Sequence, residues 1–140
     1  MTKPTHAERE YILTMPPEEY MNHLQQDYFR RLLRHERAAL LEHIEQMKHQ
    51  LQESPPAGDE GDIALREEQL RLLFRQIDRE SRLLPKYDAA LVRLQKGEYG
   101  YCRETGDPIG LPRLLLRPTA ELGIEAKTKA EKVEVQYRKK

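Results

Sequence analysis

The chain is poor in the residues that build enclosed catalytic sites. Among its 140 residues there is no tryptophan, and there are two phenylalanines and one cysteine. A single cysteine excludes an internal disulfide and cannot supply a four-thiolate zinc site. Hydrophobic residues make up 38% of the chain and charged residues 34%, a balance typical of long helices with solvated faces. We therefore expect a protein without a deep substrate cleft, which is not an enzyme.

The chain also lacks an excess of one charge and a long apolar run. Its 24 basic residues balance 24 acidic ones, so it has no general attraction to nucleic acid, and we expect no direct sequence-specific DNA binding. No segment approaches the roughly 20 apolar residues that cross a bilayer, and the charged first residues are unlike a signal peptide. We expect a soluble, cytoplasmic monomer that binds another protein and no membrane.

Two long helices are predicted from the spacing of apolar residues. Residues 1–17 end in two prolines and are predicted to form an extended arm. Residues 18–53 contain no glycine or proline, and their apolar stripe has heptad spacing: Leu33, Leu40, Ile44, Met47 and Leu51. A second stripe alternates steps of three and four and is interrupted by Glu80; its members are Leu70, Leu73, Ile77, Leu84, Tyr87, Leu91 and Leu94.

A break between the stripes predicts how the helices pair. Residues 54–62 hold two prolines and two glycines, which end the first helix, and Asp62 is a suitable N-cap for the second. Residues 18–96 are thus predicted to fold as a long antiparallel coiled-coil hairpin with its tip at 54–62. Pro85 predicts a kink or a helix restart, either as a local bend or as a functional hinge.

The remaining residues predict a small globular region and one more helix. Residues 97–122 are rich in turn-forming residues with short β-type pieces, and residues 123–140 read as a charged C-terminal helix. The predicted fold class is mainly α.

The end of the chain resembles a known family. The motifs Gly100-Tyr101-Cys102, Asp107-Pro108-Ile109-Gly110 and Arg117-Pro118-Thr119-Ala120 follow one another as in the zinc-finger end of DksA/TraR proteins. Members of that family also carry a coiled-coil hairpin upstream. The resemblance covers the chain from about residue 18 onward.

The resemblance departs from the family at the zinc ligands. The family's pattern is two Cys-x2-Cys pairs, whereas the four positions here hold Cys102, Thr105, Gly123 and Ala126. Threonine, glycine and alanine side chains are not zinc ligands, so we expect no zinc and a degenerate zinc-finger-like region, as in zinc-independent members of the family. Cys102 is either a small buried residue in the former metal site or a redox-sensing thiol activated by positive charge nearby, where Arg103 is adjacent.

The predicted tip carries the family's functional motif, Asp-x-x-Asp-x-Ala. Its three defining positions are Asp59, Asp62 and Ala64. The resemblance implies that these residues enter the secondary channel of RNA polymerase, where carboxylates can perturb a metal- and nucleotide-binding centre. The alternative is an ordinary solvated turn with Asp62 as a helix cap.

The resemblance also assigns roles to basic residues. It implies that the polymerase is contacted by Arg75, Arg79, Arg82 and Arg113, with support of the fold as the alternative role for Arg113. It implies a site for ppGpp, a co-regulator bound at the polymerase interface rather than a prosthetic group, formed by Leu83, Lys86, Arg117 and Lys127. Arginine and lysine suit pyrophosphate groups, although charged residues along a helix are more often simply a solvated face.

The resemblance implies a regulator of transcription in the stringent response. It would control the stability of promoter complexes together with ppGpp and without zinc. Two alternatives remain: a Gre-like transcript cleavage factor that holds Mg²⁺ with its tip carboxylates, and a structural coiled-coil adaptor with no polymerase role.

Overall fold

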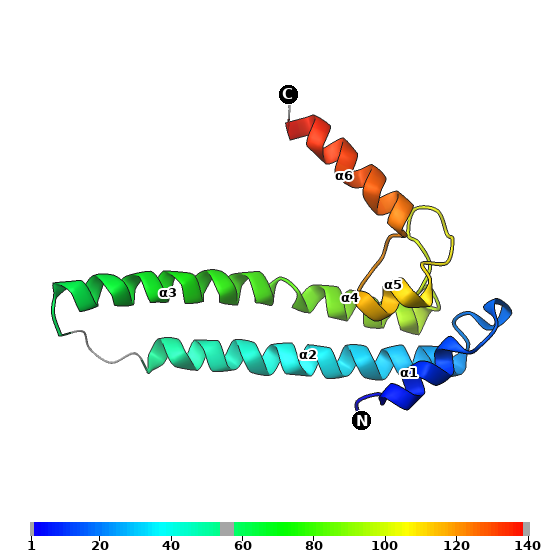
Figure 1. Ribbon diagram of the computed structural model, residues 1–140, viewed down its shortest axis with the longest axis horizontal. Coiled ribbons are helices and arrows are strands. Elements are labelled where there is room, and N and C mark those ends of the chain that lie inside the picture. The colour runs from blue at the N-terminus through cyan, green and yellow to red at the C-terminus, as the bar shows by residue number, and fades with distance from the viewer. Residues whose placement is uncertain (1, 54–57, 139–140) are drawn as a thin grey trace. The chain divides into compact units, whose positions relative to one another are not determined.

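The computed structural model describes residues 2–53 and 58–138 as helices joined by turns (Figure 1). In chain order the elements are α1 (His6–Leu13), the 3₁₀ turn η1 (Pro17–Glu19), α2 (His23–Gln52), α3 (Glu60–Ser81), α4 (Leu84–Lys96), α5 (Leu111–Leu116) and α6 (Ile124–Arg138). Within those residues no strand forms, and the predicted β-type pieces reduce to an isolated antiparallel bridge between Tyr101 and Pro108. The mainly α fold class is confirmed. In the same part of the chain, no helix is long and apolar enough to cross a membrane.

The chain divides into two compact units. One comprises residues 35–86, and the other combines the residues up to Arg34 with those from Tyr87 onward. Helix α2 contributes to both units.

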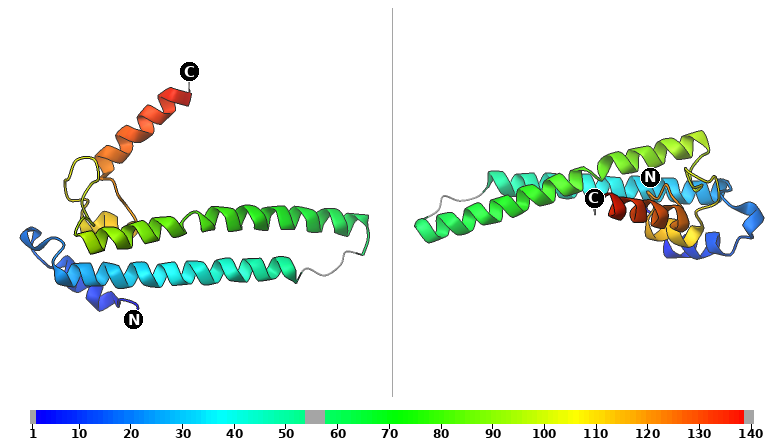
Figure 2. Two further views of the ribbon diagram at one scale, coloured as in Figure 1. Left: turned by 180° about the vertical axis from the view of Figure 1, so that it is seen from behind. Right: turned by 90° about the horizontal axis from the view of Figure 1, so that it is seen from above.

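The unit of residues 35–86 is an antiparallel helical hairpin. Helix α3 returns alongside the second part of α2 (Figures 1 and 2). The α2 stripe faces α3, since Ile44 and Met47 are only 2% and 3% exposed. Leu73 and Ile77 of α3 are partly buried. The stripes predicted from the sequence therefore form the contact between these helices. Ser54 to Ala57, at the start of the predicted tip, lie outside the described residues.

The polar interruption of the second stripe has a partner across the hairpin. The carboxylate of Glu80 lies 2.8 Å from Nδ1 of His43. The Glu80 side chain is 18% exposed, so this pairing offsets part of the cost of placing a carboxylate within an apolar stripe.

The predicted break near Pro85 is confirmed as a helix restart. Helix α3 ends at Ser81 and α4 begins at Leu84, so Pro85 occupies the first turn of a new helix. In the first turn the missing proline N–H removes no helical hydrogen bond.

The other unit contains the main hydrophobic core. Phe29 and Leu33 of α2 and Leu114 of α5 are completely buried, and Ile12 of α1 and Leu94 of α4 are nearly so. These residues belong to one cluster, which also includes Tyr28, Met21, Ala90 and Tyr99. Four helices thus meet around the start of α2.

The predicted extended arm is wrong, because residues 6–13 form helix α1. Thr5 caps this helix by accepting a hydrogen bond from the backbone N–H of Glu8 (3.1 Å). Ile12 enters the core, and tertiary packing of this kind stabilises a helix too short to persist alone. The predicted helix start at residue 18 is also wrong: residues 17–19 form η1, and Met21 has a left-handed backbone (φ 58°), which keeps η1 separate from α2.

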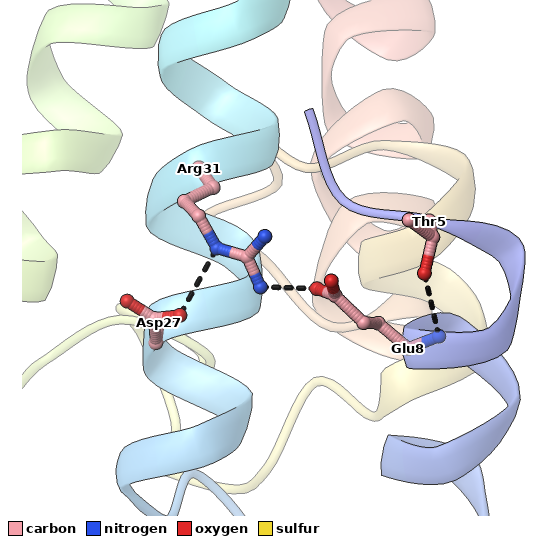
Figure 3. Close-up of polar contacts among 4 residues, drawn as sticks. All are labelled: Thr5, Glu8, Asp27 and Arg31. Atoms are coloured by element: carbon pink, nitrogen blue, oxygen red, sulfur yellow. Dashed lines mark hydrogen bonds and ion pairs between the residues drawn. The ribbon is translucent and has the colours of Figure 1, made fainter. Parts of the chain in front are cut away.

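An ion-pair network holds α1 on α2 (Figure 3). The guanidinium of Arg31 donates through Nε to the Asp27 carboxylate (3.0 Å) and through Nη2 to the Glu8 carboxylate. The Arg31 side chain is 17% exposed, so these contacts are partly shielded from solvent.

The region after α4 is a compact loop that leads into α5 and α6. The loop is closed by backbone hydrogen bonds from Cys102 to the Asp107 carbonyl (2.7 Å) and from Gly106 to the Cys102 carbonyl (2.8 Å). Helix α6 matches the predicted C-terminal helix of 123–140 and begins at Ile124, while residues 139–140 lie outside the described residues.

Candidate functional site

The acidic motif predicted for the hairpin tip lies at the start of α3. Asp59 has an extended backbone (φ −133°, ψ 178°), and its Oδ1 accepts a hydrogen bond from the backbone N–H of Asp62 (2.8 Å). Asp59 is therefore the N-cap, and the prediction that Asp62 caps the helix is wrong because Glu60 and Gly61 are already helical.

The cap leaves the other two motif residues free to face solvent. Asp62 and Ala64 lie in the first turns of α3 and are exposed. The carboxylates of Glu60 and Asp62 stand at the helix N-terminus, where the helix dipole favours negative charge. The motif thus holds exposed acidic side chains in the first turn of α3.

The basic residues predicted to contact a partner differ in their surroundings. Arg75 and Arg79 are exposed on α3. Arg82, the C-cap of α3, forms an ion pair with Asp78 (2.9 Å). Arg113 of α5 is half-buried and donates through Nε to the Leu122 carbonyl (3.0 Å), so it supports the fold of its own unit.

The four residues predicted to bind ppGpp lie two in each unit. Leu83 and Lys86 flank the start of α4, and both are exposed. Arg117 is the exposed C-cap of α5, and Lys127 lies in the first turn of α6, 3.8 Å from Glu131. Lys86 and Arg117 are thus exposed cations, Lys127 is half-buried beside Glu131, and the binding role of all four residues stays a prediction.

The four degenerate zinc positions lie together. Cys102, Thr105, Gly123 and Ala126 all line one cavity of about 270 Å³. Cys102 and Ala126 are buried, with 4% and 8% exposure. A methyl group placed on Gly123 would lie 3.9 Å from the Cys102 Cβ, an ordinary packing distance.

These residues do not fit a zinc ion. Cys102 is the only thiol among them, and Gly123 and Ala126 offer no side-chain donor. In the described part of the chain, no group of three or more His, Cys, Asp and Glu side chains could hold a metal. The Cys102 thiol instead accepts hydrogen bonds from the Thr105 side chain and from the backbone N–H of Gly123, which lower its pKa from 9.0 to about 7.

Arg103 does not act as the sequence suggested. Its guanidinium forms an ion pair with Glu121 (2.9 Å), and its backbone N–H donates to the Glu121 carbonyl (2.8 Å). The shift in the pKa of Cys102 comes from hydrogen bonds rather than from this adjacent charge. The Arg103–Glu121 pair fastens the loop to the segment before α6, a role the sequence does not reveal because the partners are far apart in the chain.

The hairpin, its acidic end and the finger-like loop define a coiled-coil protein with a zinc-finger-type appendage, and comparison with known proteins gives the family. Residues 25–94 match the model of the DnaK suppressor protein DksA, N-terminal domain, and residues 97–132 match the prokaryotic dksA/traR C4-type zinc finger. The chain belongs to the DksA/TraR family.

Individual relatives agree with this assignment. The chain is 41% identical to the RNA polymerase-binding transcription factor DksA of Caulobacter vibrioides (strain NA1000 / CB15N) over 86% of each chain. It is 39% identical to the protein of the same name from Escherichia coli (strain K12), over 83% of this chain and 78% of that one.

A solved structure is similar as well. The structure of transcription factor DksA2 from Pseudomonas aeruginosa aligns with a TM-score of 0.83 and 50% identity, covering 91% of this chain and 98% of that one. These relatives are named as transcription factors, and their family is not enzymatic, which confirms the prediction that the chain is not an enzyme.

Proposed function

We propose that this chain is an RNA polymerase-binding transcription regulator. The observation that carries the proposal is the identity of 41% and 39% to relatives named for RNA polymerase binding, over more than four-fifths of the chain. The matches to both the DksA N-terminal domain and the dksA/traR zinc finger support this proposal.

The proposed mechanism has the hairpin enter the secondary channel of the polymerase. Asp62 and Ala64 are exposed at the start of α3, and Asp59 caps that helix. Carboxylates held there can alter the hydration and the metal environment of a catalytic centre, which changes the lifetime of promoter complexes. Arg75 and Arg79 are exposed on the same helix and are proposed polymerase contacts, with Arg82 and Arg113 as further contacts.

The proposed co-regulator is ppGpp, bound at the polymerase interface through Leu83, Lys86, Arg117 and Lys127. Guanidinium and ammonium groups bind pyrophosphate through charge-assisted hydrogen bonds. This role places the protein in the stringent response and in the cytoplasm, where the polymerase works.

Zinc independence is the third part of the proposal. The support is chemical: one thiol stands where the family has four, and hydrogen bonds from Thr105 and Gly123 engage that thiol. We expect activity and fold to persist when zinc is withdrawn.

The decisive experiment measures promoter-complex lifetime and transcription from a ribosomal-type promoter. Purified polymerase is combined with ppGpp and the wild-type protein, with and without a zinc chelator. We expect inhibition that survives chelation and is lost in Asp62→Asn and in Ala64→Thr. Glu67→Gln, an exposed change on α3 outside the motif, is the matched control and should behave as wild type.

Other results would point elsewhere. Mg²⁺-dependent shortening of stalled transcripts would identify a cleavage factor. A wild-type protein that folds but leaves the polymerase unaffected would leave the coiled-coil adaptor as the better hypothesis. Inhibition lost on chelation would overturn zinc independence alone.

A further inference from the structure

The hydroxyl group of Tyr20 joins two segments that lie far from it in the chain. It donates a hydrogen bond to the Gly100 carbonyl (2.6 Å) and accepts one from the Gly110 backbone N–H (2.9 Å). The Tyr20 hydroxyl is therefore a donor to the Gly100 end of the loop and an acceptor for the Gly110 end. All three residues belong to the same compact unit.

The loop between Gly100 and Gly110 is closed at this point. The Gly100 carbonyl also accepts a hydrogen bond from Ile109 (2.8 Å), and Tyr101 forms a bridge with Pro108. The ring of Tyr20 packs edge-on against Tyr101, with centroids 5.5 Å apart and an interplanar angle of 86°. Tyr20 thus contacts the stem of the loop through both its hydroxyl and its ring.

The backbone of the loop lies directly against the turn that holds Tyr20. A methyl group on Gly100 would come within 2.9 Å of the Met21 side chain and 3.2 Å of the Tyr20 hydroxyl. Gly100 also has a positive φ of 90°, which side chains rarely adopt. The loop therefore packs against Tyr20 and Met21 so closely that position 100 has no room for a side chain.

The Gly110 end of this contact sets the start of α5. Gly110 is the N-cap of α5, which has no side-chain capping bond, and the Gly110 carbonyl accepts from Leu114 (3.1 Å). The helix has six residues, less than two turns, and its C-cap is Arg117. A hydroxyl that fixes Gly110 therefore fixes the place from which Arg117 projects.

We propose that Tyr20 is a positioning residue for Arg117: its hydroxyl holds both ends of the 100–110 loop and thereby sets the orientation of α5. This inference rests on the proposed role of Arg117 toward ppGpp. The loop has no fitting metal ligands to close it, so a side chain from the α1–α2 junction performs that closure. Tyr20 itself touches no ligand in this scheme.

Burial favours the protonation state that this role needs. Desolvation of the half-buried phenol raises the pKa of Tyr20 above 10.0, against the hydrogen bond from Gly110, which lowers it. The hydroxyl therefore keeps its proton near neutral pH and can donate to Gly100 throughout.

The first experiment tests the hydrogen bond between Gly110 and Tyr20 in the protein alone, without polymerase or ppGpp. Amide hydrogen exchange of Gly110 is measured by NMR in the full chain for wild type, Tyr20→Phe and Tyr11→Phe, the last removing a hydroxyl from an exposed ring on α1. We expect exchange at Gly110 to speed up about tenfold in Tyr20→Phe, as the loss of its acceptor requires, with Leu33 in the core of α2 unchanged. Unchanged exchange at Gly110 overturns the proposal.

The second experiment tests whether Tyr20 and Arg117 are energetically coupled in the response to ppGpp. The ppGpp concentration for half-maximal shortening of promoter-complex lifetime is measured for wild type, Tyr20→Phe, Arg117→Ala and the double variant. We expect each single variant to raise this ppGpp concentration several-fold, a change that corresponds to the free energy of about one charge-assisted hydrogen bond. The double variant should raise the concentration little more than Arg117→Ala does alone. Fully additive effects, or no effect of Tyr20→Phe, overturn the positioning role.

A second variant guards against general damage. Gly100→Ala pushes the loop away from Tyr20 and Met21, and it should reproduce both effects of Tyr20→Phe while the helical circular dichroism is retained. A wild-type protein that shortens promoter-complex lifetime but does not respond to ppGpp would overturn the proposed ppGpp site and the role of Arg117 with it. The Gly110 exchange would still decide whether Tyr20 holds the loop.

Discussion

Gln25 is a buried polar side chain on which the junction of α1 and α2 depends. It is 1% exposed, its Oε1 accepts from the Met21 N–H (2.7 Å), and its Nε2 donates to the Ile12 carbonyl (3.3 Å). Burial of these groups is tolerated because each has a partner.

Gln25→Met keeps the length of the side chain and removes both hydrogen bonds. Because the Met21 N–H would then be buried without a partner, we expect the free energy of unfolding in urea to fall by about 1–3 kcal/mol. The matched control is Gln52→Met at the exposed end of α2, which should cost no more than about 0.5 kcal/mol. Equal losses at the two positions would contradict the role of Gln25.

Cys102 should titrate well below an ordinary thiol. Hydrogen bonds from the Thr105 side chain and from the Gly123 backbone favour the thiolate and lower the pKa to about 7. A depressed pKa means that the folded state holds the thiolate better than the unfolded chain does. The resulting stabilisation is complete above pH 9 and is lost as the pH falls through 7.

Ultraviolet thiolate absorbance against pH checks this expectation. The midpoint in the wild type should lie near pH 7, and Thr105→Val, which removes the largest cause of the shift, should move it upward. Glu104→Gln, an exposed change beside it, should not remove the shift. A wild-type midpoint near 9 would contradict the hydrogen-bonding scheme.

The start of α3 depends on one cap that also belongs to the proposed functional tip. Asp59→Ala removes the acceptor for the Asp62 N–H and should lower the free energy of unfolding by about 0.5–2 kcal/mol, measured in urea by loss of helical circular dichroism. Asp59→Asn keeps an acceptor oxygen while removing the charge, so it should retain most of the stability. If both variants lose the same stability, charge rather than capping is the cause.

Helix pairing could be predicted from the sequence, whereas helix ends and distant contacts could not. The stripes of α2 and α3 have a local period, and that period determines which face is buried. Helix α1 was missed because only Ile12 of its eight residues is buried, so the helix has no apolar stripe. The two prolines that follow it also favour an extended segment. The cap at Asp59 and the left-handed Met21 depend on backbone geometry that several residues can satisfy.

In the candidate site, too, the family motifs could be predicted from the sequence and the contacts between distant residues could not. The gathering of the four former zinc positions follows from the family motifs, and the structure brings those residues around one cavity. The contacts of Tyr20 with Gly100 and Gly110 join residues 80 and 90 positions apart, and no periodicity encodes such pairs.

The two units should differ in local stability. Helix α3 has no buried residue, whereas the other unit contains a cluster with Phe29, Leu33 and Leu114 fully buried. Because amide protection follows the buried apolar contacts that must open, we expect amides of α3 to exchange at least about tenfold faster than those of α2 around Leu33. Hydrogen exchange with mass spectrometry checks this, and uniform protection of both would contradict it.

Gly100 and Gly106 lie in the same loop and both have a positive φ, yet they should tolerate substitution very differently. Nothing lies within 4 Å of a methyl group on Gly106, and asparagine adopts left-handed backbone readily enough to serve there. Any side chain at Gly100 meets Met21 and Tyr20, so selection would be expected to keep glycine at 100 and to let 106 drift. The variants accepted at these two positions would therefore show how closely the turn before α2 and the loop pack together.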